Sequence, residues 1–248
     1  MPELPEVETI KNALNKFIKG KTILDIKVLY PPIVNNLDNF SKLLTNQTIK
    51  EVKREAKFLK FILDDYVLIS HLRMEGKYFI NDELTSKHTH VIFNLSDNID
   101  LAYHDTRKFG RFEIVDIKDE ANYLSEVKGL AKDPKDISFD IFYEKILNSR
   151  RPIKNILLDQ SVIGGIGNIY ANEILFKSKI NPNKKGILIT KDEAKLILKE
   201  SINTLDLAIK MGGTTIKSYK SLGESGTFQR ELLVQGREGL PWDRKSVV

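Results

Sequence analysis

Apolar side chains open the chain at the spacing of one face of an α-helix. These positions are Val7, Ile10, Leu14, Phe17 and Ile18. Pro5 and Glu6 suit the first turn, where an N–H is not needed and a negative charge meets the positive end of the helix dipole. Gly20 suits the position just after the helix, because glycine adopts the left-handed backbone found there without strain. The pattern predicts an opening helix that ends before Gly20.

Short runs rich in β-branched and aromatic residues follow, as is typical of strands. The runs are Thr22–Val28, Phe58–Leu63, Val67–Leu72, His90–Leu95 and Phe112–Val115. Acidic and Asn residues punctuate them as turns, at Asp64-Asp65, Asn81-Asp82 and Asp97-Asn98. Several short strands at this spacing indicate a sandwich or a barrel, and the pattern leaves both open.

The pattern becomes helical after a linker-like stretch, Gly129–Ser138. Helices are predicted at Phe139–Leu147, Ile153–Leu158, Asn168–Lys177 and Thr190–Met211. The last of these opens with Thr190 and Glu193, the spacing of a capping box. We therefore predict an α+β fold with two domains and a cleft between them. The expected boundaries are residues 1–130 for a β-rich domain, 131–138 for a linker, 139–224 for a helical domain and 225–248 for a further segment.

Composition narrows the class of protein. The 248 residues are 41% hydrophobic, which is enough to build real cores, and they contain no cysteine. Disulfides, thiol catalysis and thiolate metal sites are therefore excluded within this sequence. No apolar run approaches the ~18 residues that a membrane helix needs, and the acidic opening does not resemble a secretory signal. We expect a cytoplasmic protein that does not bind membranes.

The charge is unevenly distributed along the chain. Residues 145–248 hold 18 Lys and Arg against 10 Asp and Glu, a net charge of +8, and the total of +5 leaves −3 for residues 1–144. A basic half beside a mildly acidic one indicates a polyanion across part of the surface. Lysine-rich solvated helices would give a similar count, so the charge alone only suggests nucleic acid.

The first residues carry a candidate nucleophile. Pro2 follows the initiator methionine, and methionine before a small residue is normally removed, which would leave a secondary amine. An α-amino group has a pKa near ~8 against ~10.4 for lysine, so more of it is neutral and nucleophilic. Glu3 is a candidate proton donor beside it, and Glu6 is near enough to influence the local charge. Taken alone, Met-Pro-Glu more often just begins a helix.

Longer segments change that interpretation. MPELPEVETI resembles the N-terminus of the formamidopyrimidine-DNA glycosylase family, bacterial enzymes that excise 8-oxoguanine and ring-opened purines. Further matches follow in the family's order: REAKFL, HLRMEGKY, KHTHV, DTRKFGR, DQSVIGGIGNIYANEILF, GGTTIKSY and TFQRELLVQGREG. The long segment resembles the family's helix–two-turn–helix, so residues 139–224 are expected to bind DNA and to include a lesion-capping loop.

The resemblance implies a DNA glycosylase that is also a lyase at abasic sites. It assigns Pro2 as the nucleophile at the sugar C1′ and Glu3 as the proton donor for sugar-ring opening. Lys57 is assigned an acid–base role in the β-elimination that cuts the strand. The expected partner is damaged double-stranded DNA, bound by a monomer.

The resemblance also implies how the damaged nucleotide is handled. Met74, Arg107 and Phe109 resemble the triad that fills the gap left when the nucleotide is turned out of the duplex. Extrusion costs a few kcal/mol of unstacking, which an apolar wedge and a guanidinium facing the orphaned cytosine partly offset.

A second set of residues is expected to hold the DNA. Phosphate contacts are expected from His88, from Arg150 or Arg151, and from Asn168 with the glycine-rich backbone before it, because such backbone presents N–H groups to anions. Lys217 is expected in the loop that contacts the extruded lesion.

The family pattern breaks near the end of the sequence. The family normally ends in a zinc finger with four cysteines, but Trp242 and Lys245 stand where the first two are expected. Residues 225–248 are expected to be a remnant of the approach to that finger, from a truncated or frame-shifted reading or a degenerate protein. No metal or cofactor is therefore expected.

Two alternative functions remain open at this stage. One is a catalytically impaired remnant that still binds DNA. The other is an endonuclease VIII-like glycosylase for oxidised pyrimidines. The Leu-Pro-Glu start and the GGTT segment favour the purine-specific branch.

Overall fold

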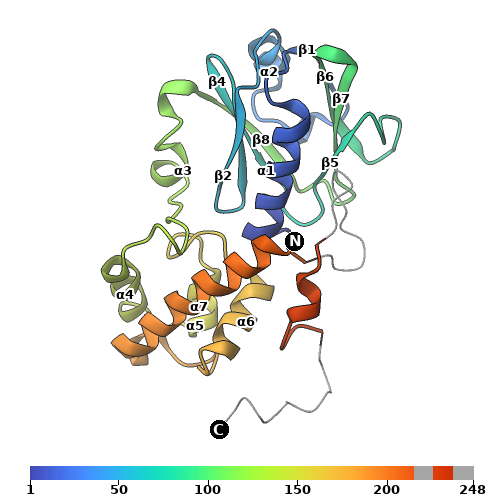
Figure 1. Ribbon diagram of the computed structural model, residues 1–248. Helices are drawn as coiled ribbons and strands as arrows, with labels where there is room; N and C mark the ends of the chain where they lie inside the picture. The colour runs from blue at the N-terminus through green and yellow to red at the C-terminus, as the bar shows by residue number, and fades with distance from the viewer. Residues whose placement is uncertain (215–225, 237–248) are drawn as a thin grey trace.

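The computed structural model describes residues 1–214 and 226–236. A β-rich part lies above a helical part, and the N-terminus lies at the junction between them (Figure 1). Lys217, Trp242 and Lys245 fall outside the described residues, as do parts of the expected segments 139–224 and 225–248.

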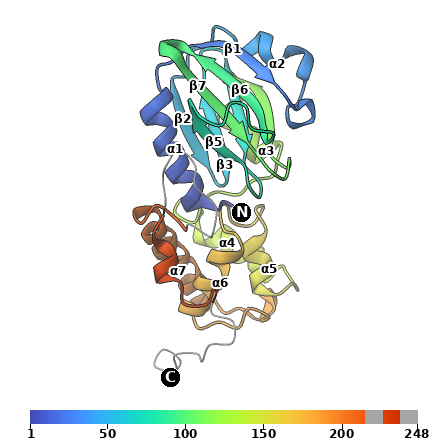
Figure 2. The same ribbon diagram turned by 90° about the vertical axis from the view of Figure 1, so that its right-hand side faces the viewer.

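The β-rich part is a sandwich of two antiparallel four-stranded sheets in the described part of the chain. One sheet has the order β1-β6-β7-β5, with the strands β1 (Ile23–Val28), β6 (Thr89–Leu95), β7 (Ile99–His104) and β5 (Lys77–Ile80). The other has the order β2-β3-β4-β8, with the strands β2 (Glu51–Glu55), β3 (Phe58–Ile62), β4 (Tyr66–His71) and β8 (Arg111–Asp116). The two open sheets decide between the sandwich and the barrel that the sequence left open (Figure 2).

Helices complete both parts of the fold. Those of the β-rich part are α1 (Leu4–Ile18), α2 (Leu37–Leu44) and α3 (Tyr123–Glu126). Those of the helical part are α4 (Phe139–Leu147), α5 (Ile153–Leu158), α6 (Asn168–Lys177) and α7 (Lys191–Lys210). Short 3₁₀ turns lie at η1 (Pro31–Ile33), η2 (Ser96–Asn98), η3 (Ile117–Asp119), η4 (Gly186–Leu188) and η5 (Phe228–Glu231). None of the helices in the described ranges is both long and apolar enough to cross a membrane.

The predicted helices agree closely with the observed ones. The predicted bounds of α4, α5 and α6 match the structure, and α7 lies between Thr190 as its N-cap and Met211 as its C-cap. The Thr190 hydroxyl accepts the Glu193 N–H at 3.2 Å, and Glu193 accepts the Thr190 N–H at 2.8 Å, which confirms the capping box. Gly20 follows α1 with a φ of +80°, the conformation that glycine was expected to supply there.

The five predicted strand-like runs are strands, and none of their ends differs by more than one residue. The sequence pattern missed the strands β2, β5 and β7 and the helices α2 and α3. The sequence of β2, EVKRE, indicates a charged segment because Val52 is its only apolar residue. β2 nevertheless lies at the edge of its sheet, where α1 packs against it.

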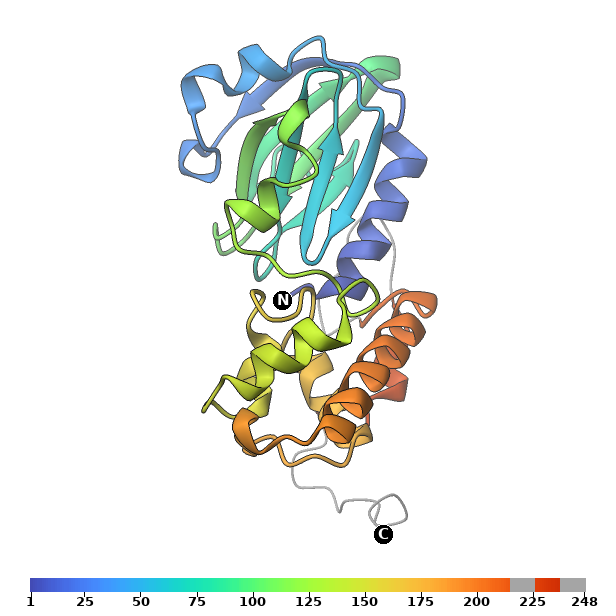
Figure 3. The ribbon, with the colours of Figure 1, turned by 90° about the vertical axis from the view of Figure 1, so that its left-hand side faces the viewer.

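Helix α1 contributes to two hydrophobic cores. Val7, Ile10, Leu14 and Ile18 lie in the core between the sheets. Leu4, one turn earlier, lies in the core of the helical part. A smaller cluster covers the outer face of the β2-β3-β4-β8 sheet beneath α3 (Figure 3). Because α1 packs on both β2 and α7, the start of the chain is held between the two parts.

The centre of the sandwich contains a cluster of aromatic rings around Phe112, which is fully buried. Its ring centroid lies 4.8 Å from that of Tyr103, 6.0 Å from that of Phe93 and 6.2 Å from that of Phe40. These rings come from α2, β6, β7 and β8, so Phe112 joins both sheets to α2.

Phe112→Ala should lower the free energy of unfolding by about 3–5 kcal/mol, because it removes a buried ring and leaves a cavity. Phe17→Ala is the matched control, since Phe17 is 45% exposed and should change stability by less than about 0.5 kcal/mol. Chemical denaturation of the two variants measures both values. Equal losses in the two variants would contradict this description of the core.

Candidate active site

Glu3 binds the N-terminus of helix α6. Its carboxylate accepts the N–H groups of Gly167 at 2.7 Å, Ile169 at 2.9 Å and Tyr170 at 3.3 Å. Gly167 is the N-cap of α6, so Glu3 supplies the capping oxygen that glycine lacks. Glu3 is only 2% exposed and is itself the N-cap of α1. One carboxylate therefore joins the first turns of two helices that are 164 residues apart in the chain.

The glycines before α6 make this contact possible. A Cβ at Gly167 would overlap the Glu3 side chain, and a Cβ at Gly165 would overlap Leu4. Gly165 also has a φ of +88°, which an L side chain rarely adopts. Its carbonyl accepts the Leu4 N–H at 3.1 Å. The run of glycines thus lets the backbone before α6 lie directly against the start of α1.

The expected phosphate site at this run has another occupant. The N–H groups of Gly167, Ile169 and Tyr170 meet the Glu3 carboxylate, and that of Gly165 donates to the Gln160 side chain at 2.9 Å. An anion does bind the helix N-terminus, but it belongs to the protein. Asn168, which the sequence also predicted to contact phosphate, is exposed.

Glu6 makes a second set of contacts one turn along α1. Its carboxylate accepts the Glu3 N–H at 2.9 Å and the Tyr170 hydroxyl at 2.7 Å. It also accepts the N–H of Thr214 at 2.7 Å and its hydroxyl at 2.9 Å. Glu6 therefore joins α1 to α6 and to the start of the GGTT segment. Sequence reasoning gave Glu6 only an electrostatic influence and did not identify Tyr170.

Lys57 lies in the turn between β2 and β3. It is 6% exposed, and its Nζ donates to the Ile166 carbonyl at 2.8 Å. Burial lowers the pKa of Lys57, and the carboxylates of Glu3 and Glu6 oppose this effect. The lysine thus reaches across the junction from the sandwich to the segment that precedes α6.

The carboxyl group of Glu3 has a strongly perturbed pKa. Burial raises the pKa of Glu3 from 4.5 to about 7, and the charge of Glu6 adds to the rise. Lys57 and the N–H groups of Ile169 and Tyr170 lower that pKa but do not cancel the effect. A carboxyl group with a pKa near neutrality can both donate and accept protons, as acid–base catalysis requires. Pro2, next to it, is also buried.

The three residues predicted to fill a gap lie on two neighbouring loops. Met74 is on the loop after β4, and Arg107 and Phe109 are on the loop between β7 and β8. Met74 is 37% and Phe109 47% exposed, and the Arg107 guanidinium lies 4.8 Å from the centre of the Phe109 ring. A hydrogen bond from Thr106 to Glu75 joins the loops. The structure brings all three side chains to one exposed edge of the sandwich.

Buried Asp105 shapes the loop that carries Arg107 and Phe109. Its carboxylate accepts the N–H groups of Arg107 at 3.0 Å, Phe109 at 2.9 Å and Gly110 at 2.8 Å. Sequence reasoning missed this residue, although it begins the matched segment DTRKFGR. An aspartate that opens a turn and faces several N–H groups is the signal that could have identified it.

His71 connects this edge to the lysine turn. His71 is paired with Phe58, the neighbour of Lys57, and it precedes the Met74 loop. Its Nδ1 accepts the Arg73 N–H at 3.0 Å. Burial, followed by the charges of Arg73 and Lys57, lowers the pKa of His71 to about 3, so its ring is neutral at physiological pH.

The predicted phosphate contacts lie on both parts of the fold. His88 is half-buried before β6, with its ring centroid 5.3 Å from that of His104, and its carbonyl accepts the Asp105 N–H. Arg150 is exposed between α4 and α5. Arg151, the alternative, forms an ion pair with Asp159 at 2.8 Å. In residues 1–214 and 226–236, no three His, Asp or Glu side chains are grouped so as to hold a metal ion.

Comparison with protein-family models gives two matches. The formamidopyrimidine-DNA glycosylase N-terminal domain matches residues 1–112. The formamidopyrimidine-DNA glycosylase H2TH domain matches residues 130–220. Together they cover most of the chain.

Individual relatives match over nearly their whole length. The formamidopyrimidine-DNA glycosylase of Oceanobacillus iheyensis is 45% identical over 249 residues, which cover 97% of this chain and 89% of the relative. That of Lactiplantibacillus plantarum is 44% identical over 98% of this chain and 91% of the relative. The Lactococcus lactis Fpg bound to DNA with an abasic site has 38% identity and a TM-score of 0.92, and the match covers 98% of this chain and 91% of that one.

A second Lactococcus lactis Fpg structure, bound to DNA that contains N7-benzyl-Fapy-dG, matches to the same extent. The family models, the relatives and the fold agree. This chain belongs to the formamidopyrimidine-DNA glycosylase family.

Proposed function

We propose that this protein excises oxidised purines from double-stranded DNA and then cuts the strand, with Pro2, Glu3 and Lys57 as its catalytic residues. One observation carries the assignment of roles: the buried start of the chain, a carboxyl group with a pKa of about 7 and a buried lysine meet at one junction. The family membership and the lesion-containing DNA bound by the relatives support the substrate class. Chromosomal DNA as substrate places the proposed activity in the bacterial cytoplasm.

The first step would use the amine of Pro2. Removal of Met1, which is 47% exposed, would leave this secondary amine as the first group of the chain. Attack of its nitrogen on C1′ forms a C–N bond while the bond from C1′ to the damaged base breaks, and the base leaves with the proton that the Pro2 nitrogen gives up. The secondary amine then gives a cationic iminium when the sugar ring opens.

Glu3 is suited to drive that ring opening. Breaking the bond between C1′ and O4′ places negative charge on O4′, which needs a proton. The protonated Glu3 carboxyl can supply it, because a pKa of about 7 leaves much of the acid form present at physiological pH. The N–H groups of α6 then stabilise the carboxylate that remains.

Lys57 is suited to the strand cut. The iminium acidifies the proton on C2′, and its removal breaks the C3′–O bond and releases the phosphate as a leaving group. Burial favours the neutral amine of Lys57, which can accept a proton, and its cation can then donate one. Water finally hydrolyses the iminium and frees Pro2.

DNA would be held along the side that carries the junction. Met74, Arg107 and Phe109 are proposed to fill the gap left by the extruded nucleotide, since all three are exposed on adjoining loops. His88, Arg150 and Asn168 are proposed as phosphate contacts on either side of the junction. Lys217 is proposed, from its place in the sequence, to contact the lesion.

Pro2→Gly should reduce borohydride trapping on an oligonucleotide with an abasic site to near background, because the secondary amine is lost. Retention of Met1 should have the same effect. Pro5→Ala is the matched control and should trap like the native protein, since Pro5 lies within α1. Gel analysis of the covalent adduct measures this, with duplex affinity unchanged throughout. Undiminished trapping by the protein that retains Met1 would assign the nucleophile to another amine, because its Pro2 nitrogen is part of a peptide bond. Absence of trapping by the native protein would favour a DNA-binding remnant.

Iminium formation at a preformed abasic site should fall about tenfold per pH unit above the pKa of Glu3, since the acid form protonates O4′ when the sugar ring opens. Glu3→Gln should slow this step by about 10²–10⁴-fold. Glu6→Gln should lower the Glu3 pKa and move the alkaline fall to lower pH, because it removes a neighbouring negative charge. Glu144→Gln on the exposed surface should not move it. Single-turnover borohydride trapping across pH measures the effect, and a profile unaltered in Glu6→Gln contradicts it.

A comparison of base release tests the lesion class separately. Faster release of thymine glycol than of 8-oxoguanine would favour a pyrimidine glycosylase.

Arg107→Ala should reduce the preference for a lesion opposite cytosine over one opposite adenine. A good base contact is worth about 1–3 kcal/mol of discrimination, so the loss should fall in that range. Lys108→Ala removes a charge from the same loop but should keep the preference, since its Nζ lies over Tyr30. Excision rates on the two duplexes at several salt concentrations give the answer. A smaller salt dependence with the preference intact would mean that Arg107 binds phosphate.

A further inference from the structure

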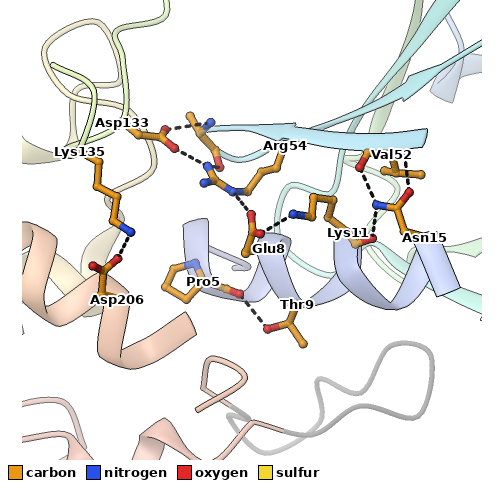
Figure 4. A network of polar contacts seen from close by, with 11 residues as sticks. Pro5, Glu8, Thr9, Lys11, Asn15, Val52, Arg54, Asp133, Lys135 and Asp206 are labelled. Atoms are coloured by element: carbon orange, nitrogen blue, oxygen red, sulfur yellow. Dashed lines mark hydrogen bonds and ion pairs between the residues drawn. The ribbon is translucent and has the colours of Figure 1, made fainter. Parts of the chain in front are cut away.

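Arg54, on the strand β2 that ends just before the lysine turn, forms a mostly buried network. Its guanidinium donates to Glu8 of α1 at 2.7 Å and to Asp133 at 2.6 Å (Figure 4). It also donates to the carbonyl of Ala56 at 3.2 Å. Asp133 lies in the segment that leads from the sandwich to α4, so the network joins three distant parts of the chain.

The network forms hydrogen bonds with both backbone polar groups of Ala56, its N–H and its carbonyl. Asp133 accepts the Ala56 N–H at 3.1 Å, while Arg54 donates to the Ala56 carbonyl. Ala56 directly precedes Lys57, and its φ of +49° lies in the left-handed region, which is uncommon for alanine. Such a conformation persists only when surrounding contacts enforce it. The Arg54–Asp133 pair supplies such contacts.

Burial makes this pair different from an ordinary surface ion pair. The side chains of Glu8, Arg54 and Asp133 are 17%, 13% and 14% exposed. Removal of one partner would leave a charge buried without compensation, so the remaining groups would rearrange. Ala56 is fully buried next to them, so a rearrangement would reach the lysine turn.

The other end of Lys57 is also held. Its Nζ donates to the Ile166 carbonyl, which accepts the Gln160 side-chain amide at 2.9 Å as well. The lysine is therefore fixed at its ammonium group by the segment before α6 and at its backbone by the Arg54–Asp133 pair. A shift of the turn would move Nζ relative to both Ile166 and Glu3.

We propose that Arg54, together with Asp133, is a positioning residue that sets the backbone turn of Lys57 for strand cleavage. The role of Arg54 rests on the acid–base role proposed for Lys57. Because Arg54 and Asp133 contact the backbone of Ala56 next to Lys57, whereas Pro2 precedes α1, loss of the pair should slow elimination more than iminium formation.

A nearby ion pair offers a matched control. Lys135 and Asp206 join the same connecting segment to α7 at 2.6 Å (Figure 4). Their side chains are 56% and 33% exposed, and the pair does not include the lysine turn. Its loss removes a contact between the two parts of the fold without affecting Ala56.

The test compares two rates on an oligonucleotide with a preformed abasic site, at saturating protein and in single turnover. Borohydride trapping reports the iminium, and strand cleavage reports the elimination. Arg54→Met should lower cleavage about 10- to 100-fold relative to trapping, the range expected when a catalytic group is displaced by about 1 Å. Lys57→Met should change the same ratio in the same direction, and Lys135→Met should leave it unaltered.

Asp133→Asn provides a milder variant in case Arg54→Met does not fold. The amide has a single acceptor oxygen, so either the Ala56 N–H or Arg54 loses its partner, and the ratio of cleavage to trapping should again fall. The double variant should be no worse than the more impaired single one, because both act through one network.

The outcomes separate the two proposals. Equal losses of trapping and cleavage in Arg54→Met and Asp133→Asn would show that the pair only stabilises the fold, and the positioning role would be wrong. The positioning role would also be wrong if the ratio of cleavage to trapping changed in Lys57→Met but stayed the same in both Arg54→Met and Asp133→Asn. Undiminished cleavage in Lys57→Met would instead refute the role of Lys57 itself.

Discussion

The contact between the Glu3 carboxylate and the N-terminus of α6 is the interaction on which the arrangement of the site depends. It caps a helix whose own N-cap is a glycine, and it surrounds a buried carboxylate with N–H groups that stabilise its charged form. It also fixes the start of α1, and with it Pro2, at the junction. The glycines at 165 and 167 follow from this contact, because any larger residue would overlap Leu4 or Glu3. Structural and chemical demands on Glu3 therefore meet in one carboxyl group.

Two forces act against each other in that group. The helix N-terminus and Lys57 favour the charged form, whereas burial and Glu6 favour the neutral form. A surface carboxylate would stay ionised at physiological pH, and a buried one without N–H partners would stay protonated. The balance keeps both forms accessible, and it requires the sandwich and the helical part to be joined tightly enough to exclude water. The exclusion of water at the junction therefore matters to the acid–base role proposed for Glu3 as much as its geometry does.

The sequence predicted the parts of this structure that depend on local pattern. Helices α4 to α6 follow apolar periodicity and cap residues, so their bounds could be read directly. Strands β2, β5 and β7 could not, because their burial depends on partners that the pattern does not reveal. The resemblance proposed Pro2, Glu3 and Lys57 as catalytic residues, but it did not predict that Glu3 occupies the helix N-terminus expected to bind phosphate. Nor could it reveal that Arg54 meets Asp133, since that contact spans 79 residues and joins segments of unremarkable composition.

The distance in sequence between the two halves of the junction has a consequence for biosynthesis. Gly167 follows Glu3 by 164 positions, and Thr214 follows Glu6 by 208. At translation rates of about 5–20 residues per second, the partners of Glu3 leave the ribosome about 8 to 30 s after Glu3 itself. During that interval the N-terminus has no site to occupy, and an aminopeptidase can reach Met1. The fold therefore leaves the nascent chain a period in which Met1 can be removed before Pro2 is buried.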